Sequence, residues 1–133
     1  MISSEILRVV LGGSYRKDRA ALERAYHELA TNGCQILSPH RMAFDDEVFT
    51  RDDAETDLTV RQIEEHHLLA LKQSHFMWLH APAGYVGVSA AFEIGYARAI
   101  GVPVFSRDVM PDPLLAEYVQ TVASVYDAKM QLL

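Results

Sequence analysis

The sequence has a single cysteine, Cys34, so no disulfide bond can form within the chain. Disulfides stabilise small secreted domains and are rare in the reducing cytoplasm. Residues 1–10 place Arg8 inside an apolar run and show no cleavage signature, which argues against a secretory signal. The sequence therefore predicts a cytoplasmic protein, with Cys34 as a small buried hydrophobic residue rather than a nucleophile.

Basic residues are also scarce. The chain has 12 lysines and arginines against 18 aspartates and glutamates, which gives a net charge of −6. Proteins that hold nucleic acid neutralise its phosphates, so this balance disfavours DNA or RNA as a partner. A long apolar segment is missing too, because histidine, proline and glycine interrupt the charge-free residues 73–92. The sequence predicts neither a nucleic-acid partner nor a membrane span.

The composition matches one globular domain over residues 1–133, since half of the residues are hydrophobic and 23% are charged. Short aliphatic runs alternate with segments of helical spacing. Strands are predicted at 6–11, 34–37, 76–79, 102–105 and 122–126, and helices after the N-cap Asp18, at 60–74, at 89–100 and after the N-cap Asp112. Because strands and helices alternate, we expect an α/β fold whose parallel sheet is covered by helices on both faces.

The loops after the first three strands are expected to meet at one edge of this sheet. In open parallel sheets, ligands bind beyond the carboxyl ends of the strands. This edge collects the glycine turn of residues 12–17, the segment from Pro39 onward and the loop 81–89. Residues 40–59 have no periodicity, lack the spacing of a calcium loop and are predicted to form a solvated lid. Seven acids lie in this segment: Asp45, Asp46, Glu47, Asp52, Asp53, Glu55 and Asp57.

The segment HAPAGYVGVSAAFEIGYA, residues 80–97, carries the strongest functional signal. Its glycine-rich loop enters a helix at about Ser89, where free amides and the positive helix end suit a phosphate, carboxylate or sugar hydroxyl. Gly87 and Ser89 are therefore candidate binding residues. Glu93 follows one turn later, with no cation at helical spacing. It is either an ionised nucleophile or an exposed complement to the helix dipole.

The string GxSxxxEIGYAxxxGxPV of residues 87–104, together with the early turn GGSY, resembles the nucleoside 2-deoxyribosyltransferase-like family, which includes deoxynucleotide N-glycosidases. The resemblance implies a flavodoxin-like (Rossmann-like) domain with about five parallel strands. It implies that Glu93 attacks the anomeric carbon of a nucleoside or nucleotide and releases the base. Water or a second base then resolves the glycosyl-enzyme, and a retaining displacement of this kind needs an ionised carboxylate. We expect such an enzyme to use neither a cofactor nor a metal.

Two family positions differ in this chain. Family members usually carry an aspartate on the helix before the third strand, and an ungapped count back from His75 places His67 there. An acidic residue usually precedes the glycine motif, where residues 83–86 read AGYV. Because a departing base needs a proton, the expected donor is His67 or a residue of the acidic segment. The alternative is that His67 is a core histidine held by a backbone carbonyl.

The first turn, residues 12–17, fits neither the P-loop pattern nor G-x-G-x-x-G. By the same resemblance, this turn binds the sugar or a 5′-phosphate, which makes Gly13, Ser14, Tyr15 and Arg16 candidate substrate-binding residues. Cations beside glycine amides suit an anion. A solvated basic helix start explains the same residues equally well.

Other functions stay open at the level of sequence. The same pocket could hold a nucleotide or a nucleoside-derived signal without turnover, or could cleave the glycosidic bond of NAD. Glu64 and His67 form one E-x-x-H pair, but a carboxylate-bridged di-metal site needs two copies. Members of the family complete each pocket with a neighbouring subunit, so we expect a homo-oligomer, at least a dimer.

Overall fold

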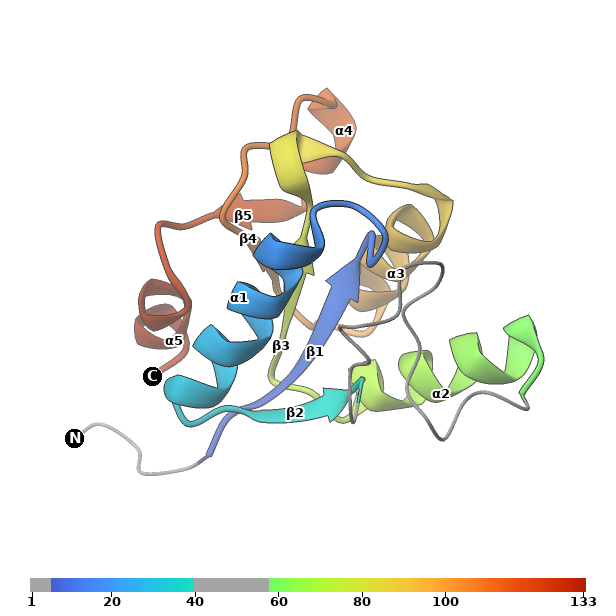
Figure 1. Ribbon diagram of the computed structural model, residues 1–133, viewed down its shortest axis with the longest axis horizontal. Helices are drawn as coiled ribbons and strands as arrows, with labels where there is room; N and C mark the ends of the chain where they lie inside the picture. The colour runs from blue at the N-terminus through green and yellow to red at the C-terminus, as the bar shows by residue number, and fades with distance from the viewer. Residues whose placement is uncertain (1–5, 40–57) are drawn as a thin grey trace.

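The computed structural model describes residues 6–39 and 58–133. Within these residues, five strands form one parallel sheet in the order β2-β1-β3-β4-β5 (Figure 1). The strands are β1 (Arg8–Gly13), β2 (Gln35–Ser38), β3 (Phe76–His80), β4 (Val104–Ser106) and β5 (Val119–Thr121). The helices are α1 (Arg19–Thr31), α2 (Val60–Lys72), α3 (Val88–Ala99), α4 (Pro113–Ala116) and α5 (Val125–Leu132), with a 3₁₀ turn η2 (Pro82–Gly84). The predicted flavodoxin-like α/β fold is confirmed.

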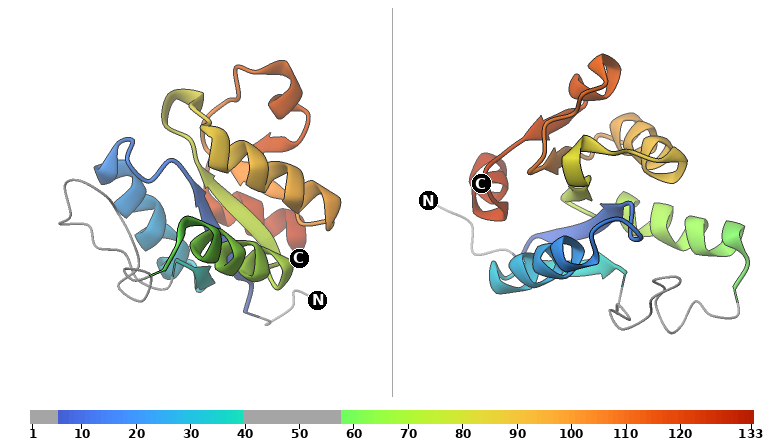
Figure 2. Two further views of the ribbon diagram at one scale, coloured as in Figure 1. Left: turned by 90° about the vertical axis from the view of Figure 1, so that its right-hand side faces the viewer. Right: turned by 45° about the horizontal axis from the view of Figure 1, so that its top comes forward.

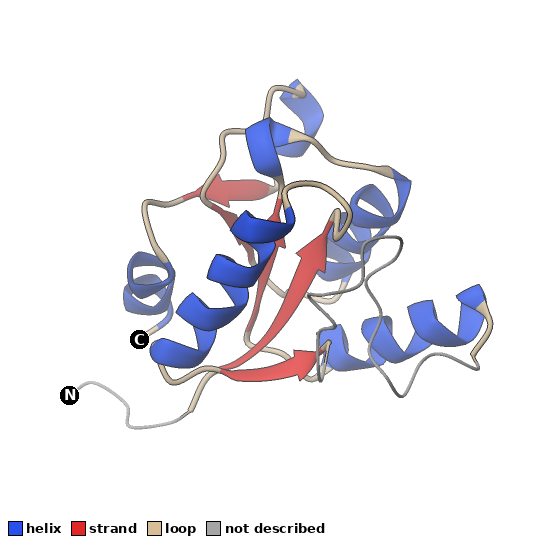
Figure 3. Cartoon of the chain, viewed as in Figure 1, coloured by secondary structure: helices blue, strands red, loops and turns tan. Residues whose placement is uncertain are grey.

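The two central strands divide the core in two, because successive side chains of a strand point to opposite faces. One core lies under α1 and α5, and the other lies under α2 and α3 (Figures 1 and 2). The first takes Val9, Leu11, Phe76 and Trp78 from β1 and β3, and the second takes Val10, Met77 and Leu79. Burying each of these large side chains contributes roughly 1.5–3 kcal/mol. Figure 3 shows the strands enclosed between helices on both faces, as expected for a parallel sheet.

Local capping chemistry sets several helix ends. The Asp18 side chain accepts a hydrogen bond from the Ala21 amide at 3.1 Å and caps α1, as the sequence predicts. The Asp112 side chain caps α4 in the same way, ahead of Pro113. Thr59 and Gln62 form a reciprocal capping box at the start of α2. These contacts fix where each helix begins, and therefore which residues of α2 reach the sheet.

The strand predicted at 122–126 is wrong. The last strand, β5, ends at Thr121, and residues 125–132 form helix α5 instead of a short tail. The side chain of Ser124 accepts a hydrogen bond from the Asp127 amide and starts this helix. Val125 and Ala128 then bury one helix face in the core under α1. The run from Val122 to Val125 satisfies a strand pattern as well as a helix pattern, and only the burial of Val125 and Ala128 on one face decides for the helix.

The first strand also ends later than predicted, since β1 continues through both glycines of the expected turn. Gly12 pairs with Leu79, and Gly13 pairs with His80 on β3.

The predicted acidic lid lies outside the described residues. In the part of the chain that the structure describes, every helix is too short or too polar to cross a membrane.

Candidate functional site

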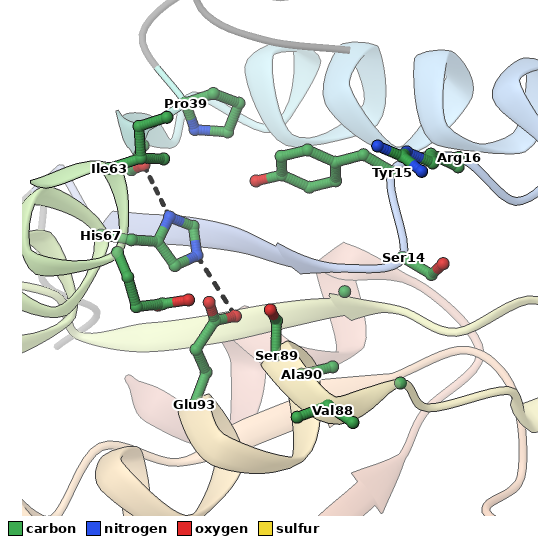
Figure 4. Close-up of a pocket in the computed structure, with 14 residues that line it drawn as sticks. Ser14, Tyr15, Arg16, Pro39, Ile63, His67, Val88, Ser89, Ala90 and Glu93 are labelled. Atoms are coloured by element: carbon green, nitrogen blue, oxygen red, sulfur yellow. Dashed lines mark hydrogen bonds and ion pairs between the residues drawn. The ribbon is translucent and has the colours of Figure 1, made fainter. Parts of the chain in front are cut away.

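A pocket of about 380 Å³ opens at the carboxyl edge of the sheet. This volume is within the range of small-molecule sites, about 300–1,000 Å³. The strand order places β1 and β3 side by side although their helices lie on opposite faces, and such a switch point is where open α/β sheets bind ligands. The structure brings all eight predicted site residues to this pocket: Gly13, Ser14, Tyr15, Arg16, His67, Gly87, Ser89 and Glu93 (Figure 4).

Glu93 is a buried carboxylate. Only 6% of the residue is exposed, between the core-facing Ala90 and Ile94 of α3. Its Oε1 lies close to β1, so that a Cβ added at Gly12 would stand 3.3 Å from it and collide with Met77. Because Gly12 has no side chain, the Glu93 carboxylate of α3 has room beside β1. The alternative of an exposed glutamate that only complements the helix dipole is wrong.

His67 lies between two polar side chains of the pocket. Its Nε2 is 3.5 Å from Oε1 of Glu93, and its Nδ1 hydrogen-bonds Oγ of Ser38 at 2.8 Å (Figure 4). The His67 side chain is only 12% exposed, so water screens the contact with Glu93 weakly. Because these partners are side chains, the alternative that His67 is a core histidine held by a backbone carbonyl is wrong. His67 is instead placed to orient the Glu93 carboxylate.

The surroundings of Glu93 decide its charge. Burial alone raises the pKa of Glu93, but the hydrogen bond from His67 and the positive charge of the protonated imidazole lower it. A hydrogen bond from Glu64 lowers it further, and the pKa of Glu93 ends below that of an ordinary glutamate. The carboxylate is therefore ionised at neutral pH although it is buried.

Glu64 is the member of this cluster that sequence reasoning missed as a partner of Glu93. Burial raises the pKa of Glu64 to about 8, helped by the hydrogen bond with Glu93 and by the negative charge of Glu93. Its Oε2 is buried and has no hydrogen-bond partner among the described residues. At neutral pH, the site therefore holds one ionised and one protonated carboxyl group in contact. The signal was the E-x-x-H spacing, which puts Glu64 and His67 on one helix face.

The loop after β1 forms a second wall of the pocket, and β3 holds it in place. A Cβ at Gly13, where φ is +117°, would lie 2.1 Å from the carbonyl oxygen of His80, so only glycine fits. The same carbonyl accepts a hydrogen bond from the Ser14 amide, and Nε2 of His80 hydrogen-bonds the carbonyl of Lys17 at 2.7 Å. The loop is thus fixed at both ends by His80.

Of the cations in this loop, the structure places Arg16 on the pocket. The Lys17 ammonium lies over the ring of Tyr85, 4.6 Å from its centroid, and contributes to holding two loops together. The Tyr15 hydroxyl donates a hydrogen bond to the carbonyl of Leu11. Ser14 and Arg16 are the side chains of this wall whose chemistry suits an anionic or hydroxylated group.

The start of α3 forms the opposite wall. The first amides of a helix have no intrahelical acceptor. In α3 the N-cap is Gly87, which has no side chain to cap them. Residues 87–90 all line the pocket. These amides and the positive end of the helix dipole favour a negative or hydroxyl-bearing group beside Ser89.

Among the described residues, no group of three or more histidine, cysteine, aspartate or glutamate side chains is arranged to hold a metal ion. Glu64 and His67, the single E-x-x-H pair of the sequence, both contact Glu93. Searches of protein-family models and of curated protein sequences found no match for this chain. Its function is therefore argued from the residues of the pocket.

Proposed function

We propose that this protein cleaves the N-glycosidic bond of a nucleoside or nucleotide, by hydrolysis or by transfer, with Glu93 as the nucleophile. The observation that supports this most is a buried carboxylate, in contact with His67 and Glu64, on the lining of a pocket of small-molecule size. A buried carboxylate is costly unless it is partnered, and it is a stronger nucleophile where water is excluded.

In the proposed reaction, an oxygen of Glu93 attacks the anomeric carbon while the bond from that carbon to the base nitrogen breaks. The electron pair of this bond leaves with the base, which takes up a proton. Water, or the nitrogen of a second base, then displaces Glu93 from the glycosyl ester. Two displacements retain the configuration at the anomeric carbon. His67 keeps the attacking carboxylate oriented, and its hydrogen bond favours the ionised form of Glu93.

The two walls of the pocket suit the sugar end of such a substrate. Arg16 and Ser14 lie on one wall, and the amides of residues 88–90 lie at the start of α3. Both offer donors to a hydroxyl or a phosphate. A 5′-phosphate between these walls would fix the sugar and leave its anomeric carbon directed at Glu93.

We also propose that the protein acts in the cytoplasm as a homo-oligomer, at least a dimer. Val88, which lines the pocket, is 88% exposed. Phe92, one helical turn further along α3, is exposed as well. A second subunit on this face would cover apolar surface and enclose the ligand. Light scattering at micromolar concentration tests this, and an active monomer of 14.9 kDa would contradict it.

The experiment that tests the function is a base-release assay over a panel of ribonucleosides, deoxyribonucleosides, their 5′-monophosphates and NAD, followed by mass spectrometry. The proposal expects a free base from a nucleoside or a nucleotide. Release of nicotinamide alone would favour cleavage of NAD. Binding of a panel member without any release, in the presence and absence of acceptor bases, would contradict the enzyme and favour a binding module.

A further inference from the structure

Besides the nucleophile Glu93, the proposed reaction needs a group that donates a proton to the departing base. We infer that Glu64 donates this proton as a carboxylic acid, in the place that the sequence analysis gave to His67; the inference rests on the proposed function. Glu64 lines the same pocket as Glu93 and touches its carboxylate. It lies one helical turn before His67, on the same face of α2.

The contacts of His67 make it unsuited to give up a proton. Both ring nitrogens are engaged, with Nδ1 on Ser38 and Nε2 on Glu93. A proton taken from Nε2 would remove the group that orients the nucleophile at the moment of attack. Glu64, in contrast, has one buried oxygen, Oε2, without a hydrogen-bond partner among the described residues. Buried polar atoms are nearly always paired in native proteins, so this oxygen is the one that a ligand is expected to satisfy.

Proton transfer from Glu64 also keeps the charge of the carboxyl pair constant. Before the reaction, Glu93 is ionised and Glu64 is protonated, so that the pair carries one negative charge. When Glu93 bonds to the anomeric carbon it becomes a neutral ester and no longer accepts the proton of Glu64 in a hydrogen bond. That proton then passes to the base nitrogen, and Glu64 takes over the negative charge. In the second step, Glu64 removes a proton from the attacking water while Glu93 leaves as a carboxylate, which restores the first state. Two adjacent negative charges never occur, and this is the arrangement that repulsion between neighbouring carboxylates favours.

The groups that face Glu64 come from three elements. Glu93 faces it from α3, His67 lies on its own helix, and Tyr15 and Arg16 line the same pocket from the loop after β1. After burial, Glu93 is the group that holds the proton on Glu64, through a hydrogen bond and through its charge. Glu64 therefore titrates only on the alkaline side of neutrality, and kcat/KM for base release is expected to fall above about pH 8.

The decisive variant is Glu64→Gln, assayed with two substrates that share a sugar. One is the best nucleoside of the panel, whose base needs a proton to leave, and the other is the matching 7-methylguanine nucleoside, whose cationic base leaves without one. Glu64→Gln should lower kcat/KM at least about a hundredfold for the first substrate, less than about tenfold for the second, and abolish the decline above pH 8. The matched control is Glu65→Gln on the exposed face of α2, where Glu65 pairs with Arg61, and it should change neither rate.

Two further variants separate this inference from its alternatives. His67→Asn should lower the rates of both substrates by a similar factor, because His67 acts on the nucleophile. Equal losses in Glu64→Gln, or a loss confined to the poorer leaving group in His67→Asn, would overturn the inference. Full activity in Glu64→Gln with an inactive Glu93→Gln would reject Glu64 as the donor and leave the proposed function intact. Full activity in Glu93→Gln would reject the proposed function itself.

Infrared spectroscopy gives a readout that does not depend on turnover. The carbonyl stretch of a protonated carboxyl group should be present at pH 7, disappear as the pH passes about 8, and be missing in Glu64→Gln. The same band should persist in Glu65→Gln. A spectrum without a protonated carboxyl band at pH 7 would contradict the inference whatever substrate is used.

Discussion

Two glutamates on opposite faces of the sheet have different partners: those of Glu28 serve structure, and we propose that those of Glu93 serve catalysis. Glu28 of α1 is fully partnered, since its Oε1 pairs with Arg107 at 2.5 Å and its Oε2 accepts the Val125 amide at 2.8 Å. These contacts tie α1 to the start of α5. Glu93 shares its contacts with two titratable groups, His67 and Glu64, and lines a pocket. The comparison indicates that the partners of a carboxylate are a better guide to its role than its burial.

The largest expected effect is on catalysis at Glu93. Glu93→Gln keeps the size of the side chain and removes the charge that attacks the anomeric carbon in the proposed mechanism. Base release should fall at least about a hundredfold, while the melting temperature changes little, as for a group needed in the transition state. Steady-state kinetics and thermal unfolding measure the two quantities. Unchanged turnover in this variant would remove Glu93 from the mechanism.

The second effect is on stability at Glu28. Glu28→Ala removes the partner of Arg107 and the acceptor of the Val125 amide at the start of α5. Loss of hydrogen bonds to a charged group should lower the free energy of unfolding by about 1–3 kcal/mol, and kcat of the folded protein should not change. Urea unfolding with an activity assay checks this. A loss of kcat without a loss of stability in Glu28→Ala would contradict the purely structural role given to Glu28.

A smaller effect is expected at Ser38, whose hydroxyl hydrogen-bonds Nδ1 of His67. Ser38→Ala frees the imidazole to rotate away from Glu93, and one typical hydrogen bond is worth about 0.5–1.5 kcal/mol. The rate should therefore fall by up to about tenfold. Ser74→Ala is the control, because Ser74 donates to the Ala70 carbonyl at the far end of α2. Equal rates in the two variants would show that Ser38 does not position His67.

A separate prediction concerns the pH dependence of stability. Glu64 binds its proton more tightly in the folded chain, with a pKa of about 8 against 4.5 for an ordinary glutamate. Between these values the folded state holds the extra proton, so the contribution of Glu64 to the free energy of unfolding decreases as the pH rises from 4.5 to about 8. Urea titrations across this range should therefore show a weaker pH dependence in Glu64→Gln than in Glu65→Gln. Identical slopes would mean that Glu64 is ionised beside Glu93 at neutral pH.

Much of the fold follows from signals that are local in the sequence. The apolar runs of β1 and β3 and the caps Asp18 and Asp112 fix their elements through neighbours a few residues away. Helix α5 was missed because Val122 and Val125 satisfy strand and helix patterns alike over so short a run. Only the packing of Val125 under α1 decides between them.

The pocket residues were predictable because each lies at the carboxyl end of a strand or in the first turns of a helix. The partnership of Glu64 with Glu93 was not, because it depends on how closely α2 packs against α3. Spacing along α2 places Glu64 and His67 on one face, but nothing in the sequence says which of them touches Glu93. In the structure both side chains contact Glu93, and the different roles proposed for Glu64 and His67 rest on these contacts.

The most direct test of the central claim is to trap the glycosyl-enzyme. A 2′-fluorinated nucleoside slows both displacements, because fluorine destabilises the positive charge that develops on the sugar, and a good leaving base then lets the intermediate accumulate. Peptide mass spectrometry should find the fluorinated sugar as an ester on Glu93, and the adduct should be missing in Glu93→Gln. An adduct on another residue, or rapid turnover of the nucleoside with inverted configuration at the anomeric carbon, would contradict the account.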